Sequence, residues 1–546
     1  MQKWAKSISA LTLVGLLTIW QIAPTFANEE KNEKGKPVNV IMLIMDGSSN
    51  NLSSLSRWYK GESLALDEIL TGASRTYSAA SAITDSAAAA TALATGHKTN
   101  SGYVGVLPSK ITMPSVKGNK KDAFKPVANV LEGAKIKGKA TGIVSASEIQ
   151  HATPAGFSSH ATKRSNYDDI AEQQVYQNMD VVLGGGLNSL KDTRKDGENL
   201  IKEIEKNKYD FVQTREEMLK SKSDKLWGAF APNALAYDFD RATTAPEQPT
   251  LAEMTEKAID TLSKDEDGFF LMVEGSKIDW AAHANDTIGM ISDFLAFDDA
   301  VNEALEFAEK DGDTLVIAVT DHGNSGITIG NHQTTHNYDI MDITEYINPL
   351  KEAKMTVEGA LSFLKEDKSN LEEVAALYGL TNLSAKELAA LKNAKNVGQT
   401  MIQLLASRAN IGYTTGGHTG DDVFLYSYGP NKITGFVDNT DLAKAMAEFM
   451  GFDLSTVTKK LFVNAEEALK EKGFTVKIDK SNEHNPKLIA KKDRRTFIID
   501  ENKNTVIREN LLKSGRKHTL TKKFNTVHFY NDQDFYVSQD VIKYIK

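Results

Sequence analysis

Polar residues able to bind metal ions stand directly after apolar runs of the chain. Asp46 follows the run 38–45, and Asp321-His322 follows the run 314–319. Carboxylate and imidazole groups suit zinc, whereas carboxylate and hydroxyl oxygens suit magnesium. Because such runs are typical of buried strands, whose carboxyl ends meet at one edge of a parallel sheet, we expect a metal centre there.

A serine and an arginine could complete a site for a phosphate ester. Asp85-Ser86 opens an alanine-rich run that is typical of a helix. A serine at a helix N-terminus lies where backbone N–H groups and the helix dipole favour an anion. A neighbouring metal could lower the pKa of the Ser86 hydroxyl. The planar guanidinium of Arg164 could bind two phosphate oxygens.

Each of these signals has an ordinary structural explanation when taken alone. Asp46 before a glycine is typical of a turn, and Asp85 before a helix is typical of a cap. Asp279 and His283 lie one helical turn apart, a spacing that is common on exposed helix faces. His418 between glycine and threonine fits an ordinary loop. Several such clusters, most of them after strands, are harder to explain as structural features alone.

The arrangement of apolar runs predicts the fold class. Buried strands alternate with helical patterns, which favours an α/β fold with a mainly parallel central sheet covered on both faces. The strands are expected at 38–45, 140–144, 181–183, 269–273 and 314–319, and the helices include 124–134, 170–178, 251–262 and 291–309.

The first residues have the composition of an export signal. Lys3 and Lys6 precede an apolar stretch, and small residues stand before a cleavage position after Ala27. This predicts a signal peptide at 1–27 and a polar linker at 28–37, with an uncleaved anchor as the alternative. The protein is then secreted and extracellular or cell-wall associated, or periplasmic if the source has an outer membrane. The chain contains no cysteine, which excludes a disulfide framework and a lipoprotein anchor.

Composition divides the remaining chain. Residues 38–452 form the predicted catalytic domain, in which 343–410 are a helical insertion or lid. Residues 453–546 form a small β-rich accessory domain. This last segment carries a net charge of +7, whereas residues 28–452 carry −18. The contrast predicts different roles for the two parts, including contact of 453–546 with an anionic surface or cell wall.

The order of the motifs, from the strand that ends in Asp46-Gly47 to Gly417-His418-Thr419-Gly420, resembles that of the alkaline phosphatases over residues 38–451. The resemblance implies an α/β/α sandwich around a long central sheet. It also implies metal-dependent hydrolysis of phosphate monoesters to alcohol and inorganic phosphate, through a phosphoserine, with an alkaline pH optimum.

The resemblance also implies roles for individual residues. Ser86 would be the nucleophile and Arg164 would hold the phosphate, in two successive in-line displacements. Two Zn²⁺ and one Mg²⁺ are implied. The implied ligands are Asp279, His283 and His418 for the first zinc, Asp46, Asp321 and His322 for the second, and Asp46, Thr153 and Glu274 for the magnesium.

Three positions depart from the pattern of some relatives. His151 stands where some carry aspartate beside the magnesium site, and it could favour zinc or cobalt there. Trp280 replaces a lysine or histidine close to the phosphate, where Asp85 is also expected. Asn324 replaces a histidine. None of these changes removes an implied metal ligand.

Other functions are open on the sequence alone. A sulfatase, phosphodiesterase or phosphomutase of the same superfamily is one alternative, although no Cys-x-Pro-x-Arg motif for a sulfatase is present. A non-catalytic phosphate-binding or cell-wall adhesive protein is another. Residues 535–541 weakly resemble the stalk-like N-terminal domains of copper amine oxidases. We expect small phosphate monoesters as partners and no recognition of nucleic acid sequence. The oligomeric state is open on the sequence, with a homodimer as one option.

Overall fold

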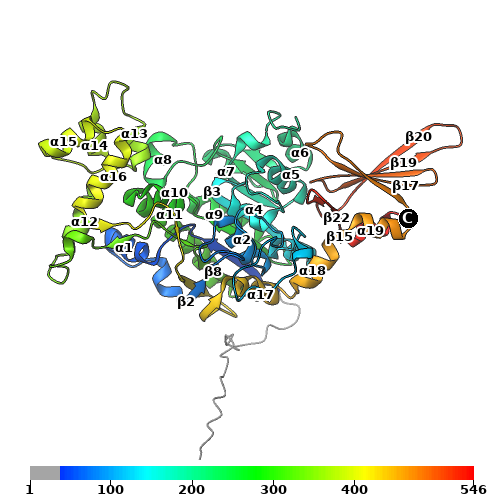
Figure 1. Ribbon diagram of the computed structural model, residues 1–546, viewed down its shortest axis with the longest axis horizontal. Coiled ribbons are helices and arrows are strands. Elements are labelled where there is room, and N and C mark those ends of the chain that lie inside the picture. The colour runs from blue at the N-terminus through cyan, green and yellow to red at the C-terminus, as the bar shows by residue number, and fades with distance from the viewer. Residues whose placement is uncertain (1–36) are drawn as a thin grey trace, which may run out of the picture.

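The computed structural model describes residues 37–546 (Figure 1). The predicted signal peptide and nearly all of the predicted linker therefore lie outside the described residues. Among residues 37–546, no helix combines the length and apolar character needed to cross a membrane.

A ten-stranded sheet forms the centre of the molecule, in the order β14-β2-β13-β8-β1-β7-β3-β4-β6-β5. Only β13 runs antiparallel to its neighbours, so the mainly parallel sheet is confirmed. The strands are β1 (Asn39–Ile44), β2 (Leu70–Arg75), β3 (Ala140–Glu148), β4 (Val181–Gly185), β5 (Asp210–Val212), β6 (Leu226–Ala229), β7 (Phe269–Glu274), β8 (Thr314–Val319), β13 (Val423–Tyr428) and β14 (Gly435–Asp438).

Helices cover both faces of this sheet, as the side chains of β1 show. Ile41 and Leu43 point into one apolar core, and Val40 and Met42 point into the other, because side chains alternate along a strand. The first core includes α1 (Asn50–Lys60), α9 (Leu251–Leu262), α10 (Lys277–Ala284) and α11 (Thr287–Asp311). The second includes α2 (Ser86–Thr95), α3 (Val130–Ile136), α4 (Ala152–Ser158), α5 (Tyr167–Gln177), α6 (Leu200–Lys206) and α17 (Asn439–Phe449). The two covered faces confirm the α/β/α sandwich.

The helix expected at 124–134 begins later than predicted. The backbone of Phe124 has a φ of 62°, and the helix starts only after Asn129, whose side chain caps it. The prediction is therefore wrong for residues 124–129.

The segment 343–410 is helical and forms a lobe at one end of the molecule (Figure 1). Asp286 ties it to the body, since its carboxylate accepts hydrogen bonds from the backbone of Val357 and from the hydroxyl of Tyr378. The helices of the lobe are α12 (Thr344–Lys351), α13 (Val357–Leu361), α14 (Leu371–Leu377), α15 (Ala385–Lys392) and α16 (Val397–Arg408).

The C-terminal residues lie at the opposite end and include a five-stranded antiparallel sheet, β16-β17-β18-β19-β20 (Figure 1). Its strands are β16 (Thr475–Asp479), β17 (Lys487–Lys492), β18 (Arg495–Asp500), β19 (Thr505–Leu511) and β20 (Lys517–Lys523). The sequence did not predict β17 or β20, which are rich in lysine. Around this sheet lie α18 (Leu454–Leu461), α19 (Ala465–Glu471), α20 (Gln539–Tyr544) and a small sheet of β15 (Val463–Asn464), β21 (Phe529–Tyr530) and β22 (Phe535–Val537).

This C-terminal region packs directly on the body of the molecule that contains the ten-stranded sheet. Val106 of the body shares an apolar cluster with Phe529 and Tyr536, and Ala128 shares another with Val457. The two parts therefore bury core surface against each other.

Candidate active site

The predicted metal ligands meet at the carboxyl ends of three neighbouring strands. Asp46 follows β1, Glu274 ends β7, and Asp321 follows β8. Since β1 pairs in parallel with both β7 and β8, these carboxylates are brought together although they are far apart in sequence. The tight turn after β1 needs Gly47, because its φ is 68° and a Cβ there would lie 2.4 Å from a carboxylate oxygen of Asp279.

The first cluster contains Asp279, His283 and His418. The Nδ1 atoms of His283 and His418 lie 3.0 and 2.8 Å from the backbone carbonyls of Gly416 and Thr84, so each Nδ1 carries the ring proton. Their Nε2 atoms then face each other as lone pairs, 3.1 Å apart. The Asp279 carboxylate lies 3.5 Å from one Nε2 and 3.6 Å from the other. Lone pairs this close are favourable only around a cation.

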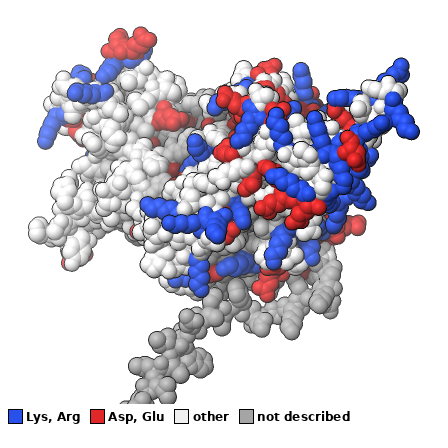
Figure 2. All heavy atoms as spheres, turned by 45° about the vertical axis from the view of Figure 1, so that its right-hand side comes forward, with Lys and Arg blue, Asp and Glu red and all other residues white. Residues whose placement is uncertain are grey.

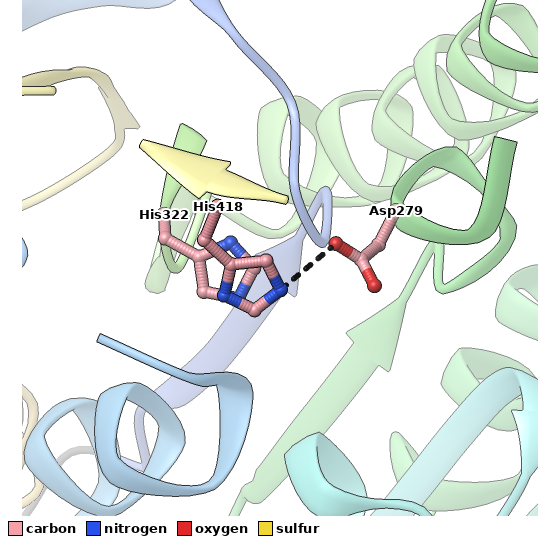
Figure 3. A group of neighbouring side chains, drawn as sticks. All are labelled: Asp279, His322 and His418. Carbon is pink, nitrogen blue, oxygen red and sulfur yellow. Dashed lines mark ion pairs between the residues drawn. The ribbon is translucent and has the colours of Figure 1, made fainter. Parts of the chain in front are cut away.

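The second cluster contains Asp46, Asp321 and His322. All three side chains are fully buried. Neither carboxylate oxygen of Asp46 has a hydrogen-bond partner among the described residues. Figure 3 shows the His322 ring beside that of His418. The two rings are stacked, with their centres 3.7 Å apart. His322 therefore stands between the first cluster and the second.

The third cluster contains Glu274, Thr153 and His151 next to Asp46. One oxygen of Glu274 and the hydroxyl of Thr153 are buried and have no hydrogen-bond partner within residues 37–546. The other oxygen of Glu274 accepts a hydrogen bond of 2.6 Å from Ser145. Buried polar atoms without partners mark positions where a bound ion completes the coordination.

The electrostatics of the three clusters favour bound cations. Burial, followed by the nearby carboxylates of Asp321 and Asp279, raises the pKa of Asp46 well above its usual value. Burial also raises the pKa of Glu274 to about 7. In contrast, His322 holds the pKa of Asp321 at about 2 against the effect of burial. Several buried carboxylates can be ionised together only if positive charge lies among them. The donor types of the three clusters fit two zinc ions and one magnesium ion.

Ser86 is the first residue of α2 and is almost completely buried. Its Oγ lies 3.2 Å from Nε2 of His322. Asp85 caps the helix, since one of its oxygens accepts a hydrogen bond of 3.1 Å from the backbone of Ala88. The expected helix cap and the expected functional site are therefore the same structure.

Arg164 lies beside this helix end. One guanidinium nitrogen donates to Asp85 at 3.3 Å, and the other donates to Nε2 of His151 at 3.0 Å. Burial and the Arg164 charge lower the pKa of His151 to about 4, so this ring is neutral. The Trp280 ring lies edge-on to the His151 ring, with the ring centres 5.9 Å apart. The structure thus brings together every residue that the sequence singled out.

Three residues in or beside the site were missed from the sequence. Ser145 and Ser276 share a hydrogen bond of 2.9 Å and line the Glu274 carboxylate. Two serines at alternate positions of the buried strand β3, Ser145 and Ser147, were a usable signal. The buried ammonium of Lys277 lies 4.9 Å from the Trp280 ring centre, and no local pattern pointed to it.

Comparison with known proteins agrees with this arrangement. The family model described as alkaline phosphatase matches residues 37–452. Alkaline phosphatase 3 of Bacillus subtilis (strain 168) is 36% identical over 485 residues, which cover 83% of this chain and 99% of that protein. Alkaline phosphatase 4 of the same organism is 37% identical over 444 residues, covering 78% of this chain and 91% of the relative.

Solved structures agree as well. The alkaline phosphatase of Thermus thermophilus is 26% identical, with a TM-score of 0.68, and the match covers 82% of this chain and 96% of that one. A histidine-to-glutamate variant of the alkaline phosphatase from the Antarctic bacterium TAB5, with Mg bound in its M3 site, is 25% identical with a TM-score of 0.55, over 77% of this chain and 99% of that one. The chain is therefore a metal-dependent phosphomonoesterase and belongs to the alkaline phosphatase family.

Proposed function

We propose that this phosphomonoesterase works through a covalent phosphoserine on Ser86. The observation that carries the proposal is the position of its Oγ, at the positive end of α2 and 3.2 Å from His322, between the second metal cluster and Arg164. A nucleophile, an anion-binding helix end and a phosphate-binding arginine meet at one point.

The roles of the side chains follow from this arrangement. The three clusters would hold metal ions, whose positive charge would lower the pKa of the attacking and leaving oxygens. Ser86 Oγ forms a bond to phosphorus while the bond to the alcohol oxygen breaks, and water then cleaves the phosphoserine to inorganic phosphate. Arg164 holds two phosphate oxygens and neutralises charge during both displacements. The serine alkoxide gains population as pH rises, which supports an alkaline optimum.

Release of phosphate from p-nitrophenyl phosphate tests this mechanism. We expect Ser86→Ala to lower kcat by at least about 100-fold while phosphate still binds, because Arg164 and the metal ligands remain. The control is Ser369→Ala, an exposed serine of the insertion lobe. A phosphorylated Ser86 peptide should be recovered from acid-quenched wild type. A wild-type kcat in Ser86→Ala would refute the covalent step.

Removal of the metals provides a separate test. A chelator should abolish turnover, and zinc together with magnesium should restore it. Metal analysis of the purified protein should find two tightly bound zincs per chain. Because His151 stands in the third cluster, we also propose that this site accepts zinc or cobalt in place of magnesium. Full turnover after complete removal of the metals would contradict the proposal.

We further propose a cellular context for the enzyme. The composition of residues 1–27 supports secretion, with cleavage after Ala27. The net charge of +7 on 453–546 supports a role for this region as an accessory domain that tethers the enzyme to an anionic surface outside the cell. The oligomeric state, monomer or homodimer, is measured directly by sedimentation of the purified enzyme.

A further inference from the structure

The sheet β16–β20 projects from the catalytic body and carries much of the positive charge of the C-terminal region (Figure 1). Residues 487–523 contain twelve Lys and Arg against four Asp and Glu. Figure 2 shows Lys and Arg gathered along this side of the molecule. Such a concentration of charge attracts anions over a long range, but by itself it does not define a binding site.

Strand register places part of this charge on one face of the sheet. Phe497 of β18 pairs with Arg508 of β19, and Arg508 pairs in turn with Leu520 of β20. Since side chains alternate, Arg495 and Lys522 share this face. About half of this face is apolar and is covered by α20. The half that carries the charged side chains is open.

The open half is a groove of about 700 Å³ between the sheet and α20. Five cationic residues line it, and Asp540 is the one acidic residue among the described residues of its lining. Asp540 is itself paired with Lys543 at 3.3 Å. The groove therefore has a net positive lining, and the cationic residues are Arg495, Arg508, Lys522, Lys543 and Lys546.

Aromatic rings hold two of these cations in place. The Arg508 guanidinium lies 5.8 Å from the Phe497 ring centre. The Lys522 ammonium lies 5.2 Å from the ring centre of Phe524 and 4.7 Å from that of Tyr544. Cations held over rings lose less freedom when they bind an anion. The same contacts occupy ring surface that would otherwise stack on nucleic acid bases.

From these observations we infer that the groove binds a linear polyol-phosphate polymer, such as an acidic cell-wall polymer. The inference deepens the proposed tether and rests on it. Guanidinium and ammonium groups along a groove match a chain of singly charged phosphates. The polymer would act as an anchor, because its internal phosphodiesters are not monoesters and would survive the enzyme. A concave groove also fits a chain better than a flat bilayer.

The test compares two charge-matched double variants of the full-length enzyme. Arg508→Gln with Lys522→Gln removes two cations from the groove. Lys477→Gln with Lys491→Gln removes two exposed lysines from the opposite face of the same sheet. Both variants change the net charge equally, so long-range attraction falls equally in each. Melting temperatures check that both variants fold.

Binding to fluorescent poly(glycerol phosphate) is measured between low and high salt. We expect the groove variant to bind at least about tenfold more weakly and to lose about 1.4 from the slope of log affinity against log salt, as for two lost phosphate contacts. The opposite-face variant should keep nearly the wild-type slope. An equal loss of affinity in both variants would contradict binding in the groove, but it would not contradict the proposed tether.

Three further arms separate other outcomes. Absence of wild-type binding to the polymer and to purified cell wall would overturn the tether itself, whereas release of phosphate from p-nitrophenyl phosphate would be unaffected. Tighter binding to single-stranded DNA would overturn the choice of polymer. Binding only to anionic vesicles would do the same, and it would point to Leu511 and Leu512, which are exposed near the tip of the β19–β20 hairpin.

Discussion

At the scale of single residues, the tautomers of the histidines decide how the site can work. His283 and His418 use Nδ1 to bond backbone carbonyls, which directs both Nε2 lone pairs to the same point as the Asp279 carboxylate. The side chain of Asn324 donates a hydrogen bond of 2.7 Å to that carboxylate. This asparagine therefore orients Asp279, a proposed metal ligand.

Replacement of Asn324 should weaken metal binding without removing a ligand. We expect Asn324→Ala to lower the zinc affinity of the first cluster by about 10- to 100-fold, as is usual when the group that orients a ligand is lost. Competition with a chelator of known affinity measures this, and excess zinc should rescue turnover. Asn348→Ala, an exposed change on α12, is the control. Unchanged zinc affinity in Asn324→Ala would show that Asp279 is oriented by other contacts.

At the scale of elements, the N-terminus of α2 combines a structural task with a functional one. One oxygen of Asp85 caps the helix, while the other accepts hydrogen bonds from Arg164 and from the backbone of Gly102. The helix end that carries Ser86 is thus joined to Arg164, the arginine proposed to hold the phosphate. An ordinary capping residue sets the distance between two parts of the site.

Two substitutions at Asp85 should separate these tasks. Asparagine caps a helix as well as aspartate does, so Asp85→Asn should cost less than about 0.5 kcal/mol of stability, whereas Asp85→Ala should cost about 1 kcal/mol. Both remove the charge that anchors Arg164, so we expect phosphate to inhibit each variant several-fold less strongly. Chemical denaturation and product-inhibition assays measure the two effects. Unaltered phosphate inhibition in both variants would show that Asp85 only caps the helix.

At the scale of the whole molecule, the C-terminal region is docked on the catalytic body. Lys503, between β18 and β19, lies 3.5 Å from the buried carboxylate of Glu172 and 2.9 Å from that of Glu198. Asn502 accepts a hydrogen bond from Gln173 on the same helix, α5, which begins three residues after Arg164. Truncation near Gly451 would expose these contacts together with the shared apolar clusters, so point substitutions are the better probe.

The Lys503 contact should contribute substantially to stability. Lys503→Met leaves Glu172 buried without its cation, which should cost about 3 kcal/mol. Lys517→Met removes an exposed ion pair with Glu509 and should cost less than about 1 kcal/mol. Adding Glu172→Gln to Lys503→Met should restore part of the loss. Urea denaturation gives these differences, and equal effects of the two lysine changes would contradict the docking role.

The docked region also predicts a dependence of stability on pH. Burial lowers the pKa of His528 to about 4, and the backbone of His528 bonds to Asn502 and Lys503. The unfolded chain takes up a proton near pH 6.5 while the folded chain does not. The contribution of His528 to the free energy of unfolding is therefore complete above pH 6.5. It falls by up to about 3 kcal/mol as pH drops toward 4. His528→Gln should flatten this acid limb in melting curves, and an unchanged limb would contradict the assignment.

The sequence by itself determined what depends on neighbouring residues. Apolar runs that end in Asp46, Glu274 and Asp321 predicted both the strands and the edge where the site lies, since strand burial and strand ends are local signals. The pair Asp85-Ser86 likewise predicted the N-terminus of a helix. The expectation that the site binds zinc or magnesium followed from the types of donor atom in the sequence. It did not need any knowledge of which residues contact each other.

Only the tertiary structure decided how distant residues meet. The parallel pairing of β1 with β7 and β8 brings the carboxylates together, and the fold brings His283 to His418 across 135 positions of sequence. The lysine-rich strand β20 gave no apolar pattern, because all its residues are exposed and it is held by pairing with β19. In β17 only three apolar residues stand between lysines, although Leu488 and Ala490 enter the core. The groove on that sheet and the docking of Lys503 therefore depend on long-range contacts that no local pattern records.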